Sequence, residues 1–93
     1  MTVRYSKQAL ANAEEIKRFL MAKFSFREVE QFYQLLLGFE EVVVKFHNIY
    51  PTSSRNVSIR QAVLSKRLTL YYTVKKNVIF IISMKDNRQG RFA

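Results

Sequence analysis

The hydrophobic residues of this 93-residue chain change their spacing once, near the middle, and this change constrains the fold more than any other feature. Up to about residue 46 they recur every three or four positions, which is typical of amphipathic helices. From residue 57 onward they alternate with polar residues or form short apolar runs, which is typical of strands. The length fits one domain, typically about 100–150 residues. We therefore expect helices and strands to share a single core over residues 1–93.

Two helices are predicted in the first half of the chain. Ser6 can cap a helix over residues 7–23, whose apolar side chains fall on one stripe. Ser25 and Glu28 fit a capping box, in which the serine hydroxyl accepts from the third amide of the helix and the glutamate reaches back. A second helix is then expected over residues 26–46. The short connection makes the two helices an antiparallel hairpin.

The second half predicts strands. Strands are expected over residues 57–64, 66–75 and 78–84, and a short one opens the chain at residues 2–6. The order is therefore β-α-α-β-β-β, an α+β fold in which the helical hairpin packs on one face of a small, mainly antiparallel sheet. The last strand is apolar on both sides and is placed at the centre, while the first strand is placed at an edge. The other face of the sheet stays bare.

Two residues of the second helix region have more than one interpretation. Gly38 costs about 1 kcal/mol relative to alanine inside a helix, and a close approach of the neighbouring helix or sheet would explain it. His47 follows the same helix and is the only imidazole of the chain. It can serve as a cation at the helix C-terminus or as a general base, and the structural role is favoured.

Composition excludes several classes of site and location. The chain has no cysteine, which excludes a disulfide scaffold, a thiol nucleophile and a cysteine-ligated zinc site. With one histidine, a histidine-rich metal site is also excluded, so neither a metal nor another cofactor is expected. No signal peptide is visible, and the longest apolar runs fall far short of the ~20 residues that span a bilayer. A cytoplasmic protein without a membrane partner is predicted.

The charge is concentrated in the second half. Residues 1–47 carry seven basic and six acidic side chains, a balance of +1, whereas residues 48–93 carry nine basic side chains and only Asp86, a balance of +8. A field of one sign attracts partners of the opposite sign. Nucleic acid, an acidic protein segment and anionic lipid all fit, and a merely solubilising surface is the alternative.

The bare sheet face is the expected binding surface. The strand over residues 66–75 should present Arg67, Thr69, Tyr71 and Thr73 there, a basic, hydroxyl-bearing and aromatic set suited to RNA or another polyanion. Further target-binding residues are predicted among the cations of this half of the chain, namely Lys66, Lys85, Arg91 and Arg60.

The chain resembles the RelE/ParE superfamily of small bacterial toxins from type II toxin–antitoxin modules. The resemblance covers nearly the whole chain and depends on an ordered set of elements: the opening strand into Ser6, the helical hairpin, the loop containing Pro51, and the final strand pair. The segments that carry it most are Leu68-Thr69-Leu70-Tyr71-Tyr72-Thr73-Val74, Val78-Ile79-Phe80-Ile81-Ile82-Ser83 and Asp86-Asn87-Arg88-Gln89.

The resemblance implies a basic toxin that an acidic antitoxin neutralises. RelE-like members enter the ribosomal decoding site and cleave mRNA without a metal, whereas ParE-like members inhibit DNA gyrase. In mRNA cleavage the ribose 2′-OH attacks the adjacent phosphate. A base removes the proton of this hydroxyl, an acid protonates the leaving oxygen, and Arg or Lys stabilises the charge on the phosphorane. Ribosome-dependent mRNA cleavage is the preferred interpretation. A gyrase inhibitor, or a weakened member that only binds its antitoxin, is the alternative.

The resemblance also suggests catalytic residues, with departures from the family pattern. Arg88 stands where the family has an arginine after the last strand. Thr69 occupies the position of another family arginine, so Arg67 would substitute for it. No tyrosine follows Arg88, and Tyr71 on the bare face is the alternative. Asp86 is either an ion-pair partner of the neighbouring cations or a catalytic acid or base, and pairing is favoured.

Overall fold

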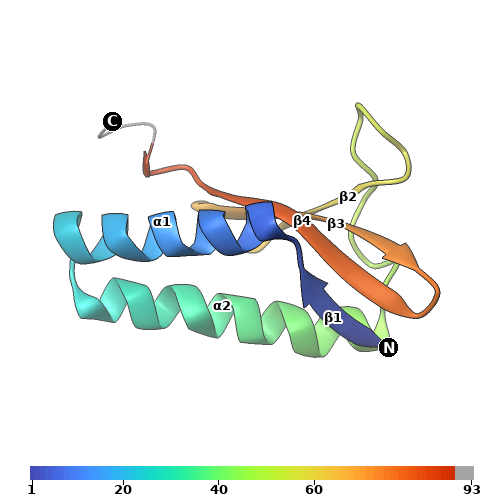
Figure 1. Ribbon diagram of the computed structural model, residues 1–93, viewed down its shortest axis with the longest axis horizontal. Coiled ribbons are helices and arrows are strands. Elements are labelled where there is room, and N and C mark those ends of the chain that lie inside the picture. The colour runs from blue at the N-terminus through green and yellow to red at the C-terminus, as the bar shows by residue number, and fades with distance from the viewer. Residues whose placement is uncertain (90–93) are drawn as a thin grey trace.

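The elements of the chain follow one another in the order that the hydrophobic spacing predicts (Figure 1). The computed structural model describes residues 1–89, and the predicted binding residue Arg91 lies outside this part. Within the described part the elements are β1 (Thr2–Tyr5), α1 (Lys7–Lys23), α2 (Phe26–Lys45), β2 (Arg60–Val63), β3 (Leu68–Lys75) and β4 (Val78–Asp86). None of these helices is long and apolar enough to cross a membrane.

The four strands form one mixed sheet in the order β1-β4-β3-β2. The β1 strand pairs parallel to β4, whereas β2–β3 and β3–β4 are antiparallel. The β3–β4 turn places both Lys76 and Asn77 at positive φ, the backbone of a type I′ hairpin turn. The predicted α+β fold is confirmed, with β4 at the centre and β1 at an edge.

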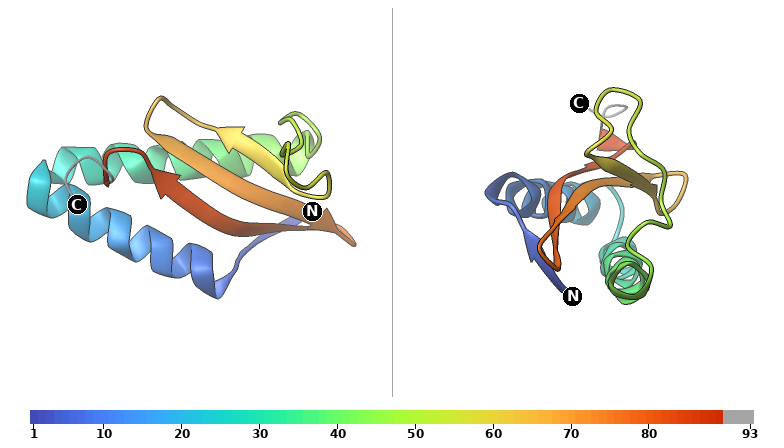
Figure 2. Two further views of the ribbon diagram at one scale, coloured as in Figure 1. Left: turned by 90° about the horizontal axis from the view of Figure 1, so that it is seen from above. Right: turned by 90° about the vertical axis from the view of Figure 1, so that its right-hand side faces the viewer.

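Both helices cover the same face of the sheet, as the two views of Figure 2 show. The core lies between them and the sheet, and Tyr72 is its largest fully buried side chain. The Tyr72 ring meets Phe39 of α2 edge-on at 5.4 Å between centroids, and its hydroxyl donates to the His47 carbonyl at 2.8 Å. Because neighbouring residues of a strand point to opposite faces, Tyr71 lies on the face without helices.

The two helix start signals have different outcomes. The Ser6 Oγ accepts from the Ala9 amide at 2.9 Å, so the first cap is confirmed. Ser25 precedes α2 but makes no side-chain capping bond, and the Glu28 carboxylate does not reach back to it. The predicted capping box is therefore wrong, because Glu28 is used in an ion pair described below.

Two strands are shorter than predicted because polar side chains form turns beside them. The expected strand over residues 57–64 begins only at Arg60, since Asn56 Oδ1 accepts from the Ser58 amide and hydroxyl. The expected strand over residues 66–75 begins only at Leu68, since Ser65 Oγ accepts from the Arg67 and Leu68 amides. Both turns satisfy backbone groups that a longer ladder would otherwise pair.

The expected close approach at Gly38 is also wrong. A Cβ built at Gly38 meets no atom within 4 Å, and the residue is exposed on the outer side of α2. Its cost in helix stability is thus not offset by a tighter contact within the described part of the chain.

We expect Gly38→Ala to raise the free energy of unfolding by about 1 kcal/mol, because alanine loses less backbone entropy in a helix and has room here. Urea denaturation followed by circular dichroism measures the change. Ala11→Gly, at an exposed position of α1, is the matched control and should lower stability by a similar amount. A neutral or destabilising Gly38→Ala would contradict the open surroundings.

Tyr5 ties the edge strand β1 to α2. Its hydroxyl donates to Glu40 Oε2 at 2.6 Å. Burial and then this hydrogen bond raise the pKa of Tyr5 above its ordinary value. A raised folded-state pKa stabilises the fold below the unfolded pKa of about 10, and the gain is lost as the pH rises beyond it.

Tyr5→Phe should therefore lower the free energy of unfolding by about 1–2 kcal/mol at neutral pH, since it removes a hydrogen bond to a charged group. Above about pH 10 the difference should shrink, because the wild type loses stability that the variant never had. Urea titrations at pH 7 and pH 11 check this. A difference that grows with pH would contradict the assigned role.

Candidate functional site: an arginine pair beside an open pocket

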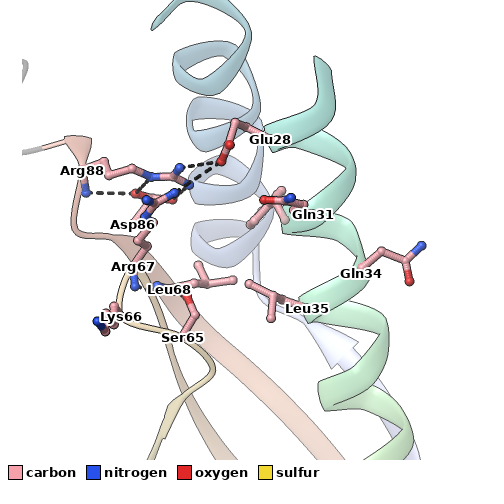
Figure 3. A pocket seen from close by; sticks show the side chains of 11 residues that line it. Glu28, Gln31, Gln34, Leu35, Ser65, Lys66, Arg67, Leu68, Asp86 and Arg88 are labelled. Atoms are coloured by element: carbon pink, nitrogen blue, oxygen red, sulfur yellow. Dashed lines mark hydrogen bonds and ion pairs between the residues drawn. The ribbon is translucent and has the colours of Figure 1, made fainter. Parts of the chain in front are cut away.

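A hollow lies between the first half of α2 and the turn at residues 65–67. Its volume is about 540 Å³, and its apolar floor consists of Phe32, Leu35 and Leu68. Lys66, Arg67, Arg88, Asp86 and Glu28 stand at its charged side, as Figure 3 shows. An apolar floor with a few convergent polar groups is the usual composition of a ligand pocket.

Backbone hydrogen bonds bring Arg67 and Arg88 together from distant parts of the sequence. Asn87 follows β4, and its amide donates to the Arg67 carbonyl at 2.7 Å. Its side-chain Nδ2 donates to the Lys66 carbonyl at 3.0 Å. The turn before β3 is thereby fastened to the segment after β4 that carries Arg88. The sequence singles out the run Asp86-Asn87-Arg88 as part of a site. Only the fold shows that this run contacts the turn at residues 65–67.

Asp86 and Arg88 form a buried ion pair. Asp86 Oδ1 accepts from the Arg88 amide at 2.9 Å and from its Nε at 3.1 Å, and Oδ2 accepts from Nη2 at 2.9 Å. Asp86 is 2% exposed and the Arg88 side chain is 13% exposed. The favoured interpretation of Asp86 as the ion-pair partner of Arg88 is confirmed, and its carboxylate is fully engaged in holding that side chain.

Glu28 completes the cluster from the first turn of α2. Its Oε2 accepts from Arg88 Nη1 at 2.8 Å and lies 3.5 Å from Arg67 Nη1. The bonds to Asp86 and then Glu28 raise the pKa of Arg88 above its ordinary value. The Phe24 ring centroid also lies 5.0 Å from the Arg88 guanidinium carbon. Glu28 was missed as a site residue because its spacing from Ser25 indicated a helix cap.

The remaining predicted site residues do not join this cluster. Tyr71 and Lys85 lie on the opposite face of the sheet, since their strand neighbours Tyr72 and Asp86 face the helices. Arg60 donates to the Tyr50 carbonyl at 2.7 Å, beyond the far end of α2. The expectation that Arg67, Tyr71 and Arg88 share the bare face is therefore wrong, because both arginines turn toward Glu28.

Two further residues are also placed by the fold. Thr69, where the resemblance implies an arginine, is only 8% exposed, so this threonine offers little surface to a ligand. His47 lies after the C-terminal end of α2, and its Nδ1 is 2.9 Å from Asn48 Oδ1. His47 is thus at the other end of α2 from the arginine pair. Among residues 1–89, no three His, Cys, Asp or Glu side chains are grouped as metal ligands would be.

The fold matches solved toxin–antitoxin structures over nearly its whole length. A chain of the chromosomal ParDE TA system from P. aeruginosa superposes with a TM-score of 0.70 at 15% identity, covering 92% of this chain and 95% of that one. This chain has the RelE/ParE fold. A chain of the heterotetrameric YoeB–YefM toxin–antitoxin complex from Staphylococcus aureus gives 0.53 at 19% identity, covering 89% and 92%. YafQ from E. coli gives 0.52 at 12% identity, covering 98% and 97%.

These likenesses are of structure rather than sequence. No protein-family model matches the chain, and no curated protein matches it. In this chain the arginine pair sits at one end of the central strands β3 and β4, beside the start of α2.

We expect Asp86→Ala to lower the free energy of unfolding by about 3 kcal/mol, because it leaves a mostly buried guanidinium with only one of its two carboxylates. Urea denaturation measures the loss. Glu41→Ala, an exposed position of α2, is the control and should stay within about 0.5 kcal/mol of wild type. A loss below about 1 kcal/mol for Asp86→Ala would show that the buried pair contributes little.

Proposed function

We propose that this chain is the toxin of a type II toxin–antitoxin module and that it inhibits translation in the cytoplasm by cleaving ribosome-bound mRNA. The RelE/ParE fold, shared with the YoeB–YefM toxin–antitoxin complex, supports the toxin role. The observation that carries the proposed reaction is the convergence of Arg67 and Arg88 at one side of an open pocket.

Paired guanidinium groups suit phosphate chemistry without a metal. Arginine donors match phosphate oxygens in geometry and remain charged at every physiological pH. In cleavage by the ribose 2′-OH, negative charge develops on the phosphorane, and positioned cations stabilise it. Arg88 is held rigidly by Asp86, and Arg67 has a side chain that is 56% exposed and can meet a ligand. Lys66 adds a further cation beside the same pocket.

An acidic antitoxin is the proposed protein partner. The chain carries a net charge of +9, and all six of its glutamates lie on the two helices. The strands and the loops after α2 therefore present cations with few internal counter-charges. A negatively charged segment would be attracted to this side of the molecule.

Inhibition of DNA gyrase is the second candidate. The superposition with a chain of the ParDE system has a higher TM-score, 0.70, than those with YoeB and YafQ chains, 0.53 and 0.52. The absence of Tyr71 from the arginine cluster also favours a binding role over catalysis. A chain that only binds its antitoxin is the remaining alternative.

Expression of the protein alone in bacteria tests the proposal. We expect growth arrest with new 5′ ends in ribosome-bound mRNA, mapped by sequencing. Growth arrest with a DNA-damage response and intact mRNA would instead support gyrase inhibition, and normal growth would support a role limited to antitoxin binding.

Arg67→Ala is the sharpest variant, because Arg67 is largely exposed and its loss spares the buried pair. We expect cleavage to fall by about 100-fold, the scale of losing one group that stabilises transition-state charge. Lys76→Ala, in the β3–β4 turn, removes the same charge far from the pocket and should retain activity. Full activity of Arg67→Ala in a folded protein would refute its catalytic role.

A further inference from the structure

Glu28 is a carboxylate in the place where the proposed ligand would bind. It stands three residues after Ser25 at the start of α2, where it could reach back to the cap. It extends instead to the two arginines, at 2.8 Å from Arg88 Nη1 and 3.5 Å from Arg67 Nη1. Two guanidinium cations attract this carboxylate, whereas the backbone amide of the cap carries no net charge, which favours the ion pair over the cap.

The arrangement of donors shows what Glu28 occupies. Arg88 gives its Nε and Nη2 to Asp86, so Nη1 is the donor that it turns toward Glu28. One oxygen of Glu28 lies between this Nη1 and that of Arg67 (Figure 3). A phosphate oxygen bound by both arginines would occupy the position that the Glu28 oxygen now has. The carboxylate and the phosphate are both anions and repel each other, so they cannot bind there together.

The cluster allows Glu28 to leave while Arg88 stays in place. The Glu28 side chain is 23% exposed and lines the open pocket, so it can turn outward into solvent. Asp86 is buried and keeps two donors of Arg88 as well as its amide. The backbone amide of Ser25, the N-cap residue of α2, offers the Glu28 carboxylate an alternative donor in the capping box that the sequence predicts.

We propose that Glu28 is an internal substitute for a phosphate group, and that the pocket binds phosphate only when Glu28 moves off Arg67 and Arg88. This inference rests on the proposed function in one respect: it takes the arginine pair to be the anion-binding part of the site. Glu28 then sets the affinity of the site by competing with the ligand. Until a phosphate replaces the carboxylate, Glu28 balances the positive charge of the two arginines and holds their side chains in place.

Isothermal titration of the purified protein with inorganic phosphate, and separately with a six-nucleotide single-stranded RNA, tests the competition. We expect Glu28→Gln to bind both probes about fivefold more tightly than wild type, since a like charge about 4 Å from the ligand is removed. A gain for both probes identifies the RNA backbone as a source of the phosphate. A gain for inorganic phosphate alone identifies a free phosphate.

Glu30→Gln is the matched control. It removes the same charge from an exposed position of α2 that does not line the pocket, and its affinity should change less than twofold at physiological salt, where exposed charges are screened. Glu28→Gln binding no more tightly than Glu30→Gln would overturn the proposal.

The competition can also be tested on the wild-type protein, where the result does not depend on correct folding of Glu28→Gln. In NMR titration with phosphate, the side-chain carboxyl carbon of Glu28 should shift as its ion pairs are replaced, while the Nε–H of Arg88 keeps its signal. An unchanged Glu28 carboxyl signal at saturating phosphate would also overturn the proposal.

The two proposals fail in distinguishable ways. If the expressed wild type cuts ribosome-bound mRNA but Glu28→Gln gains no phosphate affinity, only the competition by Glu28 is wrong. If Glu28→Gln gains affinity but the expressed protein leaves mRNA intact, the competition stands and the proposed translation target is wrong.

Discussion

The guanidinium of Arg88 joins parts of the chain that are far apart in sequence. It is held by Asp86 at the end of β4 and by Glu28 at the start of α2, 60 positions away. Desolvating such charges is costly, and the cost is met only because the donors have carboxylate partners at hydrogen-bond distance. This contact joins the start of α2 to the end of β4 and forms the charged side of the pocket between them.

The same contact decides which surface of the sheet carries the candidate site. Helices cover one face only, so the bare face with Tyr71 and Lys85 offers an obvious surface for a polyanion. The two arginines nevertheless turn toward Glu28 at the start of α2, because the glutamates of the chain all lie on the helices. The molecule has a net charge of +9 and few carboxylates. The positions of these carboxylates determine which basic side chains form internal ion pairs and which are available to a ligand.

The RelE/ParE fold accommodates this local variation without change in its architecture. Thr69 is buried where the family resemblance expects an arginine, and Arg67, two residues earlier, takes a place beside the pocket. Asn87 makes this possible, since its amide and side chain fasten the turn before β3 to the segment after β4. The same fold can therefore carry different side-chain clusters at this place, and function follows from the cluster and not from the fold alone.

The sequence by itself determined the order of elements, the bounds of both helices to within a residue, and the central place of β4, because each depends on local hydrophobic spacing. It also singled out Arg67, Arg88 and Asp86. Only the tertiary structure decided that Glu28 leaves its helix cap, that Tyr71 lies on the other face, and that Gly38 meets open space. These outcomes depend on contacts between residues distant in sequence, and two guanidinium cations across the fold attract Glu28 more strongly than the uncharged backbone amide of its helix cap does.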